Sequence, residues 1–436
     1  MSSFSELGLI EPLLRAIKAE GYTIPTPVQE KAIPIAIQGI DILGVAQTGT
    51  GKTAAFTLPI LQWIEESGER AVPNSPRALI LTPTRELAIQ IDESIKTYGR
   101  HVDHKHAVIF GGVGQGPQVT KLRKGIHTLV ATPGRLLDLM QQGHIRLDRV
   151  GAFVLDEADR MLDMGFINDV RKVVAKLPDR RQSLLFSATM PSAITTLAEQ
   201  ILWKYERIEI RPAATTADRV EQRVLFVLKN NKRELLQELF DDPLMDRAIV
   251  FTRTKHGADK VAKFLNQRGI QSNAIHGNKS QSARQRALGG FKDGQVRALI
   301  ATDIASRGID IDDVSHVINF DLPNEPESYV HRIGRTARAG ADGMALSFCD
   351  ADELEFLDNI EKIIRQKVPI EGNHSFHEDR IAAMHADHSI PRPPTFKAQQ
   401  GGRGGQGGGG GRSHNHNPRS GGAPKGGSRR QNNRGR

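Results

Sequence analysis

The sequence has a single cysteine, Cys349, among its 436 residues. One cysteine excludes a disulfide within the chain and any zinc site built from cysteines, which is typical of a reducing compartment. We expect Cys349 to be a buried small hydrophobic residue rather than a catalytic thiol. No apolar run reaches membrane-spanning length, and the first residues, MSSFSELGLIEP, lack the basic start and long apolar core of a signal peptide. These absences predict a soluble cytoplasmic protein without a membrane partner.

Acidic residues are missing from the C-terminal end of the chain. Residues 391–436 contain ten Lys and Arg but no Asp or Glu, and subtracting these ten charges from the formal +9 leaves −1 for residues 1–390. Residues 401–436 include fourteen glycines and no aliphatic side chain larger than Ala or Pro. Such a segment buries too little surface to offset its ordering entropy, so we predict a disordered tail.

Two functions suit this basic tail. It can hold nucleic acid through phosphates as a mobile polycation, or it can serve as a solubilising linker. We favour the first because the charge has no acidic counterpart. Base-specific recognition is not expected, since residues 401–436 have one Arg-Gly-Gly step, at Arg403, and no Phe, Tyr or Trp.

A phosphate-binding loop is predicted from the stretch AQTGTGKT. The mostly apolar residues 40–45 precede it, and a helix-compatible run, 53–64, follows it. In a strand–loop–helix unit, backbone N–H groups surround phosphate oxygens at the positive end of the helix. Lys52 would reach the β and γ phosphates and Thr53 would ligate Mg²⁺. The predicted nucleotide contacts are Ala46, Gln47, Thr48, Gly49, Thr50, Gly51, Lys52 and Thr53, with Ala46 where the general pattern has glycine.

The stretch DEAD, residues 156–159, supplies the acidic half of the same site. It ends the apolar run 152–155, which predicts a fully buried strand. A carboxylate leaving such a strand lies where open α/β sheets bind ligands. Asp156 is therefore the expected Mg²⁺ partner, and Glu157 the expected base or water-positioning group. A glycine turn and a solvated helix start would each explain one stretch alone, but both in this order predict a nucleoside triphosphate site.

Apolar runs alternate with helix-like segments from Ala78 onward, which predicts an α/β fold with mainly parallel sheets. The pattern weakens at 211–219 and then restarts without a second phosphate loop. Arg335 and Arg338, three residues apart in HRIGRTARAG, would share one helix face and donate to a γ-phosphate; the alternative is a solvated basic helix. The predicted divisions are 1–32, a first domain 33–210, a linker 211–219, a second domain 220–370, an extension 371–390 that is either helix or linker, and the tail 391–436.

This ordered set of motifs resembles the DEAD-box RNA helicases of superfamily 2, from about Phe4 to Ile370. The resemblance implies two tandem RecA-like domains and ATP hydrolysis that is stimulated by RNA. It also identifies GYTIPTPVQ, residues 21–29, as an adenine-reading motif. By this resemblance Gln29 pairs with the adenine edge, Tyr22 lies against its ring and Phe4 is the upstream aromatic. The alternative is that Gln29 only caps the helix that follows.

The resemblance also assigns further residues. The RNA-contacting set is Pro83, Thr84, Arg85, Gly111, Gly112, Thr132, Gly134, Arg135, Arg253, Arg284 and Thr302. On the ATP side of the second domain it places Asp303, Gly308 and Asp310. Residues that couple the two sites are Asp159, Ser187, Thr189 and His331. Ser306 and Ala337 are near-isosteric departures from the usual Ala and Gly.

The implied mechanism is closure of two domains around ATP and RNA. Glu157 aligns the attacking water, while Lys52, Arg335 and Arg338 stabilise the transferring phosphoryl group. Contacts to ribose and phosphate predict little sequence preference. The stretches FTRTKHGADK and IHGNKSQ with the Gly/Arg-rich tail look most like the bacterial RhlE group, with ribosome assembly or RNA turnover as the setting and ribosomal precursors or RNA-decay machinery as partners. The competing functions are a non-catalytic RNA-binding scaffold and a superfamily 2 DNA helicase.

Overall fold

The computed structural model describes residues 3–47, 49–210, 220–242, 245–303, 314–336 and 343–391. Several predicted features therefore lie outside the described residues. They are Thr48, the linker 211–219, Ser306, Gly308, Asp310, Ala337, Arg338 and the tail beyond residue 391. Among the described helices, none combines the length and the apolar character that crossing a membrane requires.

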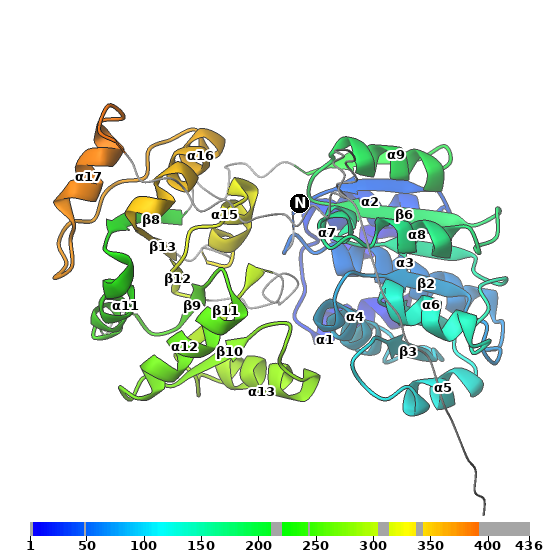
Figure 1. The fold of residues 1–436 in the computed structure, drawn as a ribbon. Helices are drawn as coiled ribbons and strands as arrows, with labels where there is room; N and C mark the ends of the chain where they lie inside the picture. Colours follow the sequence, from blue (N-terminus) through cyan, green and yellow to red (C-terminus); the bar gives the residue numbers. More distant parts are fainter. Residues whose placement is uncertain are drawn as a thin grey trace, which may run out of the picture. The chain divides into compact units, whose positions relative to one another are not determined.

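The first domain is built on a parallel sheet (Figure 1). Its strands are β1 (Ile42–Val45), β2 (Ala78–Leu81), β3 (His106–Ile109), β4 (Thr128–Ala131), β5 (Ala152–Leu155), β6 (Gln182–Ser187) and β7 (Glu206–Glu209). They lie in the order β3-β4-β2-β5-β6-β1-β7, and every neighbouring pair is parallel. The surrounding helices are α1 (Glu11–Ala19), α2 (Pro27–Ile37), α3 (Lys52–Ser67), α4 (Arg85–Tyr98), α5 (Gly116–Arg123), α6 (Pro133–Gln141), α7 (Ala158–Asp163), α8 (Ile167–Val174) and α9 (Ser192–Ile201), after a 3₁₀ turn, η1 (Phe4–Leu7).

The strands of this sheet are apolar on both faces because each face carries a layer of helices. In β5, Ala152 and Val154 join one core with α2, α3 and α4. Phe153 and Leu155 point the other way and join a second core with α6, α8 and α9. Successive strand residues alternate between faces, so two covered faces require a continuous apolar run. This is why four-residue strands could be predicted from the sequence.

The second domain repeats this architecture. Its strands β8 (Val220–Phe226), β9 (Ala248–Phe251), β10 (Ser272–Ile275), β11 (Ala298–Ala301), β12 (His316–Asn319) and β13 (Gly343–Cys349) are ordered β10-β11-β9-β12-β13-β8, again with parallel neighbours. The helices are α11 (Lys232–Phe240), α12 (Lys255–Asn266), α13 (Gln281–Lys292), α15 (Pro326–Ile333), α16 (Leu354–Ile364) and α17 (Asp379–Ala386), with 3₁₀ turns η2 (Lys229–Asn231) and η3 (Ala351–Glu353). Two α/β domains with parallel sheets confirm the predicted fold class, and Cys349 is buried, as expected.

The C-terminal extension packs on the outer edge of the second sheet. Val224 of β8 donates to the Pro369 carbonyl at 2.9 Å, and the Glu371 N–H donates back to the Val224 carbonyl at 2.8 Å. Beyond this pairing, α17 places Ile381 and Met384 in the core that contains β8. For the extension 371–390 the sequence left helix and linker open. The structure shows that it includes a helix, α17, packed against the second domain.

Parallel strands bring their carboxyl ends to one edge of each sheet. In the first domain the predicted phosphate loop follows β1, the box with Arg85 follows β2, and Asp156 follows β5. In the second domain Arg253 follows β9 and Thr302 follows β11. This edge is where open α/β sheets bind ligands.

Candidate active site

The phosphate loop joins β1 to α3 and depends on Gly51. Gly51 caps α3 with a φ of 89°, in the left-handed region that disfavours any residue with a Cβ. A Cβ at this position would lie 2.5 Å from Gln29 Nε2 and 2.9 Å from Thr26 Oγ1. Both the backbone conformation and the close approach of Gln29 therefore require glycine.

Lys52 begins α3 and is buried within the same loop. Its ammonium donates to the Ala46 carbonyl at 2.9 Å. This bond spans six residues and keeps the cation at the loop, where backbone N–H groups at a helix N-terminus favour anions. The helix starts one residue earlier than predicted and runs to Ser67.

Gln29 makes the contacts of a helix cap. Its Oε1 accepts from the Thr26 N–H at 2.9 Å, which is the Gln29 half of a capping box at the start of α2. Its Nε2 donates to the Gly51 carbonyl at 3.1 Å, so the cap is tied to the phosphate loop. These bonds are those of the alternative function given to Gln29 above, a cap of the helix that follows. Tyr22 is 51% exposed and remains accessible to a ligand, whereas Phe4 is buried in the core.

Asp156 and Glu157 follow β5 and differ in electrostatic environment. Burial raises the pKa of Asp156 to about 6, with Lys52 opposing that rise. For Glu157 burial is again the largest influence, but Arg160, Lys52 and Arg335 together hold its pKa below the ordinary value. Arg160 Nη1 donates to Glu157 Oε2 at 2.6 Å. Two adjacent carboxylates whose pKa values move in opposite directions are typical of a catalytic site.

The backbone at Glu157 has φ and ψ both at 53°, a left-handed conformation that is uncommon outside glycine. It forms the sharp turn from β5 into α7. Strained backbone of this kind often occurs at functional sites. The turn brings Glu157 onto the wall of a small cavity.

That cavity, of about 50 Å³, brings residues of both domains together. Its walls are formed by Lys52, Glu157, Asp159, Arg160, Asp163, Ala188, His331 and Arg335. A phosphate-loop lysine, the second DEAD carboxylate and one of the two predicted arginines thus share one space. Arg160, which pairs with Glu157, was not among the predicted site residues.

The prediction that Arg335 lies on a helix is wrong. Helix α15 ends at Ile333, and Arg335 follows in a turn. The Thr336 hydroxyl donates to the Val314 and Ser315 carbonyls, so the chain after α15 is held by contacts outside that helix. Arg338 lies outside the described residues.

Asp159 connects α7 to the end of β6. Its Oδ2 accepts from the Thr189 N–H at 2.8 Å and from the Thr189 hydroxyl at 3.0 Å. Its own N–H donates to Ser187 Oγ at 3.1 Å. The three predicted coupling residues of the first domain therefore form one hydrogen-bonded unit, and His331 lines the adjacent cavity.

A second cavity, of about 360 Å³, gathers most of the predicted RNA-contacting residues. They are Pro83, Thr84, Arg85, Gly111, Thr132, Gly134, Arg135 and Arg284. Gly112 has a φ of 76°, and a Cβ there would lie 2.1 Å from Arg85 Nη1. Glycine at this position therefore lets the arginine lie against the backbone.

Glu86 belongs to this region but was not among the predicted site residues. It is buried, and its two oxygens accept from Gln281 Nε2 and pair with Arg284 Nη2, each at 3.0 Å. Arg284 thus meets a carboxylate of the first domain. Because the partners are about 195 residues apart in the chain, residue spacing carried no signal for this contact.

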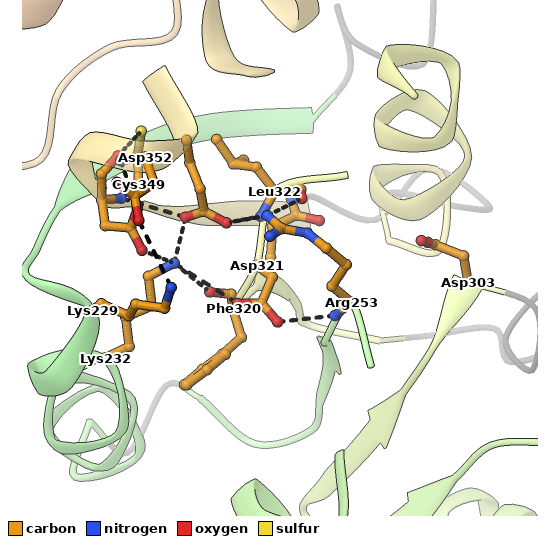
Figure 2. A network of polar contacts seen from close by, with 12 residues as sticks. Lys229, Lys232, Arg253, Asp303, Phe320, Asp321, Leu322, Cys349 and Asp352 are labelled. Atoms are coloured by element: carbon orange, nitrogen blue, oxygen red, sulfur yellow. Dashed lines mark hydrogen bonds and ion pairs between the residues drawn. The ribbon is translucent and has the colours of Figure 1, made fainter. Parts of the chain in front are cut away.

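In the second domain, Arg253 and Thr302 line a cavity of about 330 Å³. Asp303, also on its wall, forms a two-point ion pair with Arg332 at 2.6 and 2.8 Å. Arg253 belongs to a network of polar contacts around Lys232 (Figure 2). Neither Arg332 nor Lys232 was among the predicted site residues.

Family models match both domains. A model described as DEAD/DEAH box helicase matches residues 26–197, and one described as helicase conserved C-terminal domain matches residues 231–340. A protein of Geobacillus kaustophilus named DEAD-box ATP-dependent RNA helicase CshA is 43% identical over 369 residues, which cover 84% of this chain and 78% of that protein. A protein of Listeria monocytogenes named ATP-dependent RNA helicase CshA is 42% identical over 370 residues, covering 84% of this chain and 70% of its own length.

Solved structures are similar as well. The structure of Saccharomyces cerevisiae Dbp5 bound to RNA and ADP BeF3 has a TM-score of 0.74 and 32% sequence identity. The match covers 85% of this chain and 96% of that chain. The likeness therefore extends over both domains.

Proposed function

The chain belongs to the DEAD-box ATP-dependent RNA helicases, and from that premise we propose how its residues divide the binding of ATP and RNA. Each of its two parallel sheets forms the centre of a RecA-like domain. The protein is an ATP-dependent RNA helicase. We propose an RNA-stimulated ATPase that opens short RNA duplexes or remodels RNA–protein complexes. The cavity shared by Lys52, Glu157 and Arg335 supports this proposal most directly, because it joins residues of both domains around one space.

At the nucleotide, each proposed role follows from charge and position. Lys52 binds the β and γ phosphates, and Gly49 and Gly51 offer backbone N–H donors. Glu157, held ionised by its basic neighbours, positions the attacking water. Arg335 stabilises charge on the transferring phosphoryl group, together with Arg338. Gln29 reads the adenine edge from its place beside Gly51, and Tyr22 lies against the ring.

Mg²⁺ fits two residues, one after the end of β5 and one at the start of α3. Asp156 and Thr53 present a carboxylate and a hydroxyl, the hard oxygen ligands that Mg²⁺ prefers. Burial disfavours the ionised form of Asp156, and a nearby cation would favour it. We therefore propose that Asp156 and Thr53 hold the ion, which when bound neutralises phosphate charge.

For RNA, the proposed contacts are to ribose and phosphate. Arg85, Arg135, Arg253 and Arg284 supply positive charge at the carboxyl ends of both sheets. Gly111, Gly112 and Gly134 allow a backbone to approach closely. Dbp5, which is similar over both domains, was solved with RNA and ADP BeF3 bound, and this supports a ternary complex here.

A comparison of RNA with DNA tests this assignment. We expect single-stranded RNA to stimulate ATP hydrolysis by the full chain and DNA of the same sequence to have little effect, because the 2′-hydroxyl distinguishes the two. The measurement is phosphate release at saturating ATP. Equal stimulation by both would favour a DNA helicase, and hydrolysis by neither would favour an RNA-binding scaffold.

Removal of residues 391–436 tests the predicted tail. We expect weaker RNA binding and a flatter salt dependence, by about 0.7 in the slope of log K against log salt for each RNA phosphate that the tail no longer neutralises. RNA-stimulated hydrolysis at saturating RNA should persist, because the tail adds affinity by tethering. Binding should be measured by fluorescence anisotropy across salt concentrations. An unchanged slope would mean that the tail is a linker.

The stretches FTRTKHGADK and IHGNKSQ resemble the RhlE group, while the relatives described above carry the name CshA. We propose a bacterial-type helicase of the cytoplasm, where ATP and RNA are both available. Ribosome assembly or RNA turnover is the proposed setting.

A further inference from the structure

Glu353 is a buried carboxylate of the second domain that has no role in the functions proposed so far. It is 2% exposed and ends the 3₁₀ turn η3. Its place is fixed locally, because Asp350 and Glu353 cap that turn reciprocally, with the Asp350 N–H 3.4 Å from Glu353 Oε2. A fixed, buried carboxylate requires donors around it.

One of those donors is Arg253. Arg253 Nη2 donates to Glu353 Oε1 at 2.6 Å and to the Leu322 carbonyl at 3.1 Å, which uses both N–H groups of that nitrogen. The Arg253 backbone N–H donates to Asp321 Oδ2 at 2.9 Å. Figure 2 shows Arg253, Asp321 and Leu322 meeting in this network. These bonds fix both the backbone and one side of the guanidinium.

The other guanidinium donors are the three N–H groups of Nε and Nη1. The Arg253 side chain is 34% exposed, against 3% for Glu353. Arg253 also lines the 330 Å³ cavity with Thr302, another proposed RNA contact. A guanidinium held on one side by a carboxylate can bind phosphate oxygens with the donors that remain.

Lys232 contacts the carboxylate oxygen of Glu353 that Arg253 does not bind. Its buried ammonium contacts Glu353 Oε2, lies 3.4 Å from Asp350 Oδ2 and donates to the Phe320 carbonyl at 3.1 Å. Burial, the largest influence, raises the pKa of Glu353, and Lys232 opposes that rise. An ionised Glu353 makes a charge-assisted bond to Arg253, which is stronger than a neutral one.

We propose that Glu353 is a positioning residue for RNA binding, which holds the Nη2 side of Arg253 so that the remaining donors meet a phosphate of the RNA strand. Glu353 does not itself touch RNA. The inference rests on the proposed RNA-contacting role of Arg253. Lys232 serves Glu353 by balancing its charge.

The test is Glu353→Gln in the full chain, with hydrolysis measured against the concentration of an oligouridine RNA. Glutamine keeps the size and can still accept from the Leu322 N–H, which is 3.1 Å from Glu353 Oε1, but it loses the charge. We expect the KM for RNA to rise about tenfold, as for one charge-assisted bond, with kcat at saturating RNA kept within about twofold. The KM for RNA of the double variant, Glu353→Gln with Arg253→Ala, should be no higher than that of Arg253→Ala alone. Both changes remove the same interaction, the one between Glu353 and Arg253.

Glu361→Gln is the matched control. Glu361 is also buried in the second domain, but its oxygens accept from Lys367 at 2.6 Å and from the Val368 N–H at 3.1 Å. We expect this variant to leave the KM for RNA unchanged, even where its melting temperature falls as far as that of Glu353→Gln.

The outcomes distinguish the positioning role of Glu353 from the RNA-contacting role of Arg253. If Arg253→Ala raises the KM for RNA and Glu353→Gln does not, Glu353 has no positioning role and the RNA contact of Arg253 stands. If Arg253→Ala also leaves the KM unchanged, the RNA role of Arg253 fails and the positioning role falls with it. A loss of kcat that Glu353→Gln and Glu361→Gln share would make Glu353 a merely structural residue.

Discussion

Replacing Glu157 with glutamine should lower RNA-stimulated ATP turnover by at least about 100-fold, the scale of a lost general base. ATP and RNA binding should persist, because Lys52, the phosphate loop and the arginines that line the cavities are untouched. Glutamine retains a hydrogen-bonding oxygen for Arg160 but not the charge that Arg160, Lys52 and Arg335 favour. The measurements are steady-state phosphate release and equilibrium binding of a fluorescent ATP analogue.

The Glu157→Gln variant changes a buried ion pair, so its folding must be measured alongside its activity. Arg160 and Glu157 are both largely buried, and removing one charge of such a pair destabilises a protein. Asp163→Asn is the control, because it removes a carboxylate from the wall of the same cavity at an exposed position of α7. We expect it to retain turnover. Hydrolysis at the wild-type rate by a folded Glu157→Gln protein would refute the assigned role.

Gly51→Ala should also have a large effect, because it weakens the binding of ATP and leaves the residues of the hydrolysis step in place. A left-handed backbone costs a residue with a Cβ roughly 1–2 kcal/mol. The new Cβ would also lie 2.5 Å from Gln29 Nε2 and displace the side chain that ties helix α2 to the phosphate loop. We expect ATP affinity to fall by at least about tenfold, the equivalent of 1.4 kcal/mol. Calorimetric titration with ATP measures this directly.

Gly39→Ala separates the two causes. Gly39 also has a positive φ, 77°, but a Cβ there would meet nothing within 4 Å. Its substitution should lower the melting temperature through backbone strain alone and leave ATP affinity unchanged. If Gly51→Ala lowers stability only as much as Gly39→Ala and binds ATP normally, the close approach of Gln29 has no part in nucleotide binding.

The elements that the sequence predicted best are those with local causes. The apolar run 152–155 is strand β5 to the residue, because both faces of the sheet are covered and each side chain is buried. The helices α4 and α11 lie in the region from Ala78 onward, where helix-like segments were expected between the apolar runs. Periodicity and burial alone decide such segments.

The features that were missed depend on contacts between distant residues. Helix α15 ends at Ile333, partly because Thr336 bonds to carbonyls more than twenty residues earlier. Glu86 and Glu353 are charged residues in helix-like surroundings, where exposure is the ordinary expectation. Each is buried because it meets an arginine that is at least 100 residues away in the chain. No local pattern carries that information.

The segment that pairs with β8 also bears on how two copies of the protein meet. A sheet edge with open N–H and C=O groups can pair with the edge of another molecule and begin aggregation. Here Pro369 to Glu371 occupy the outer side of β8 at Val224, and Pro369 has no N–H to offer to a further strand. The residues that complete the second domain therefore also disfavour pairing of β8 with a strand of another molecule.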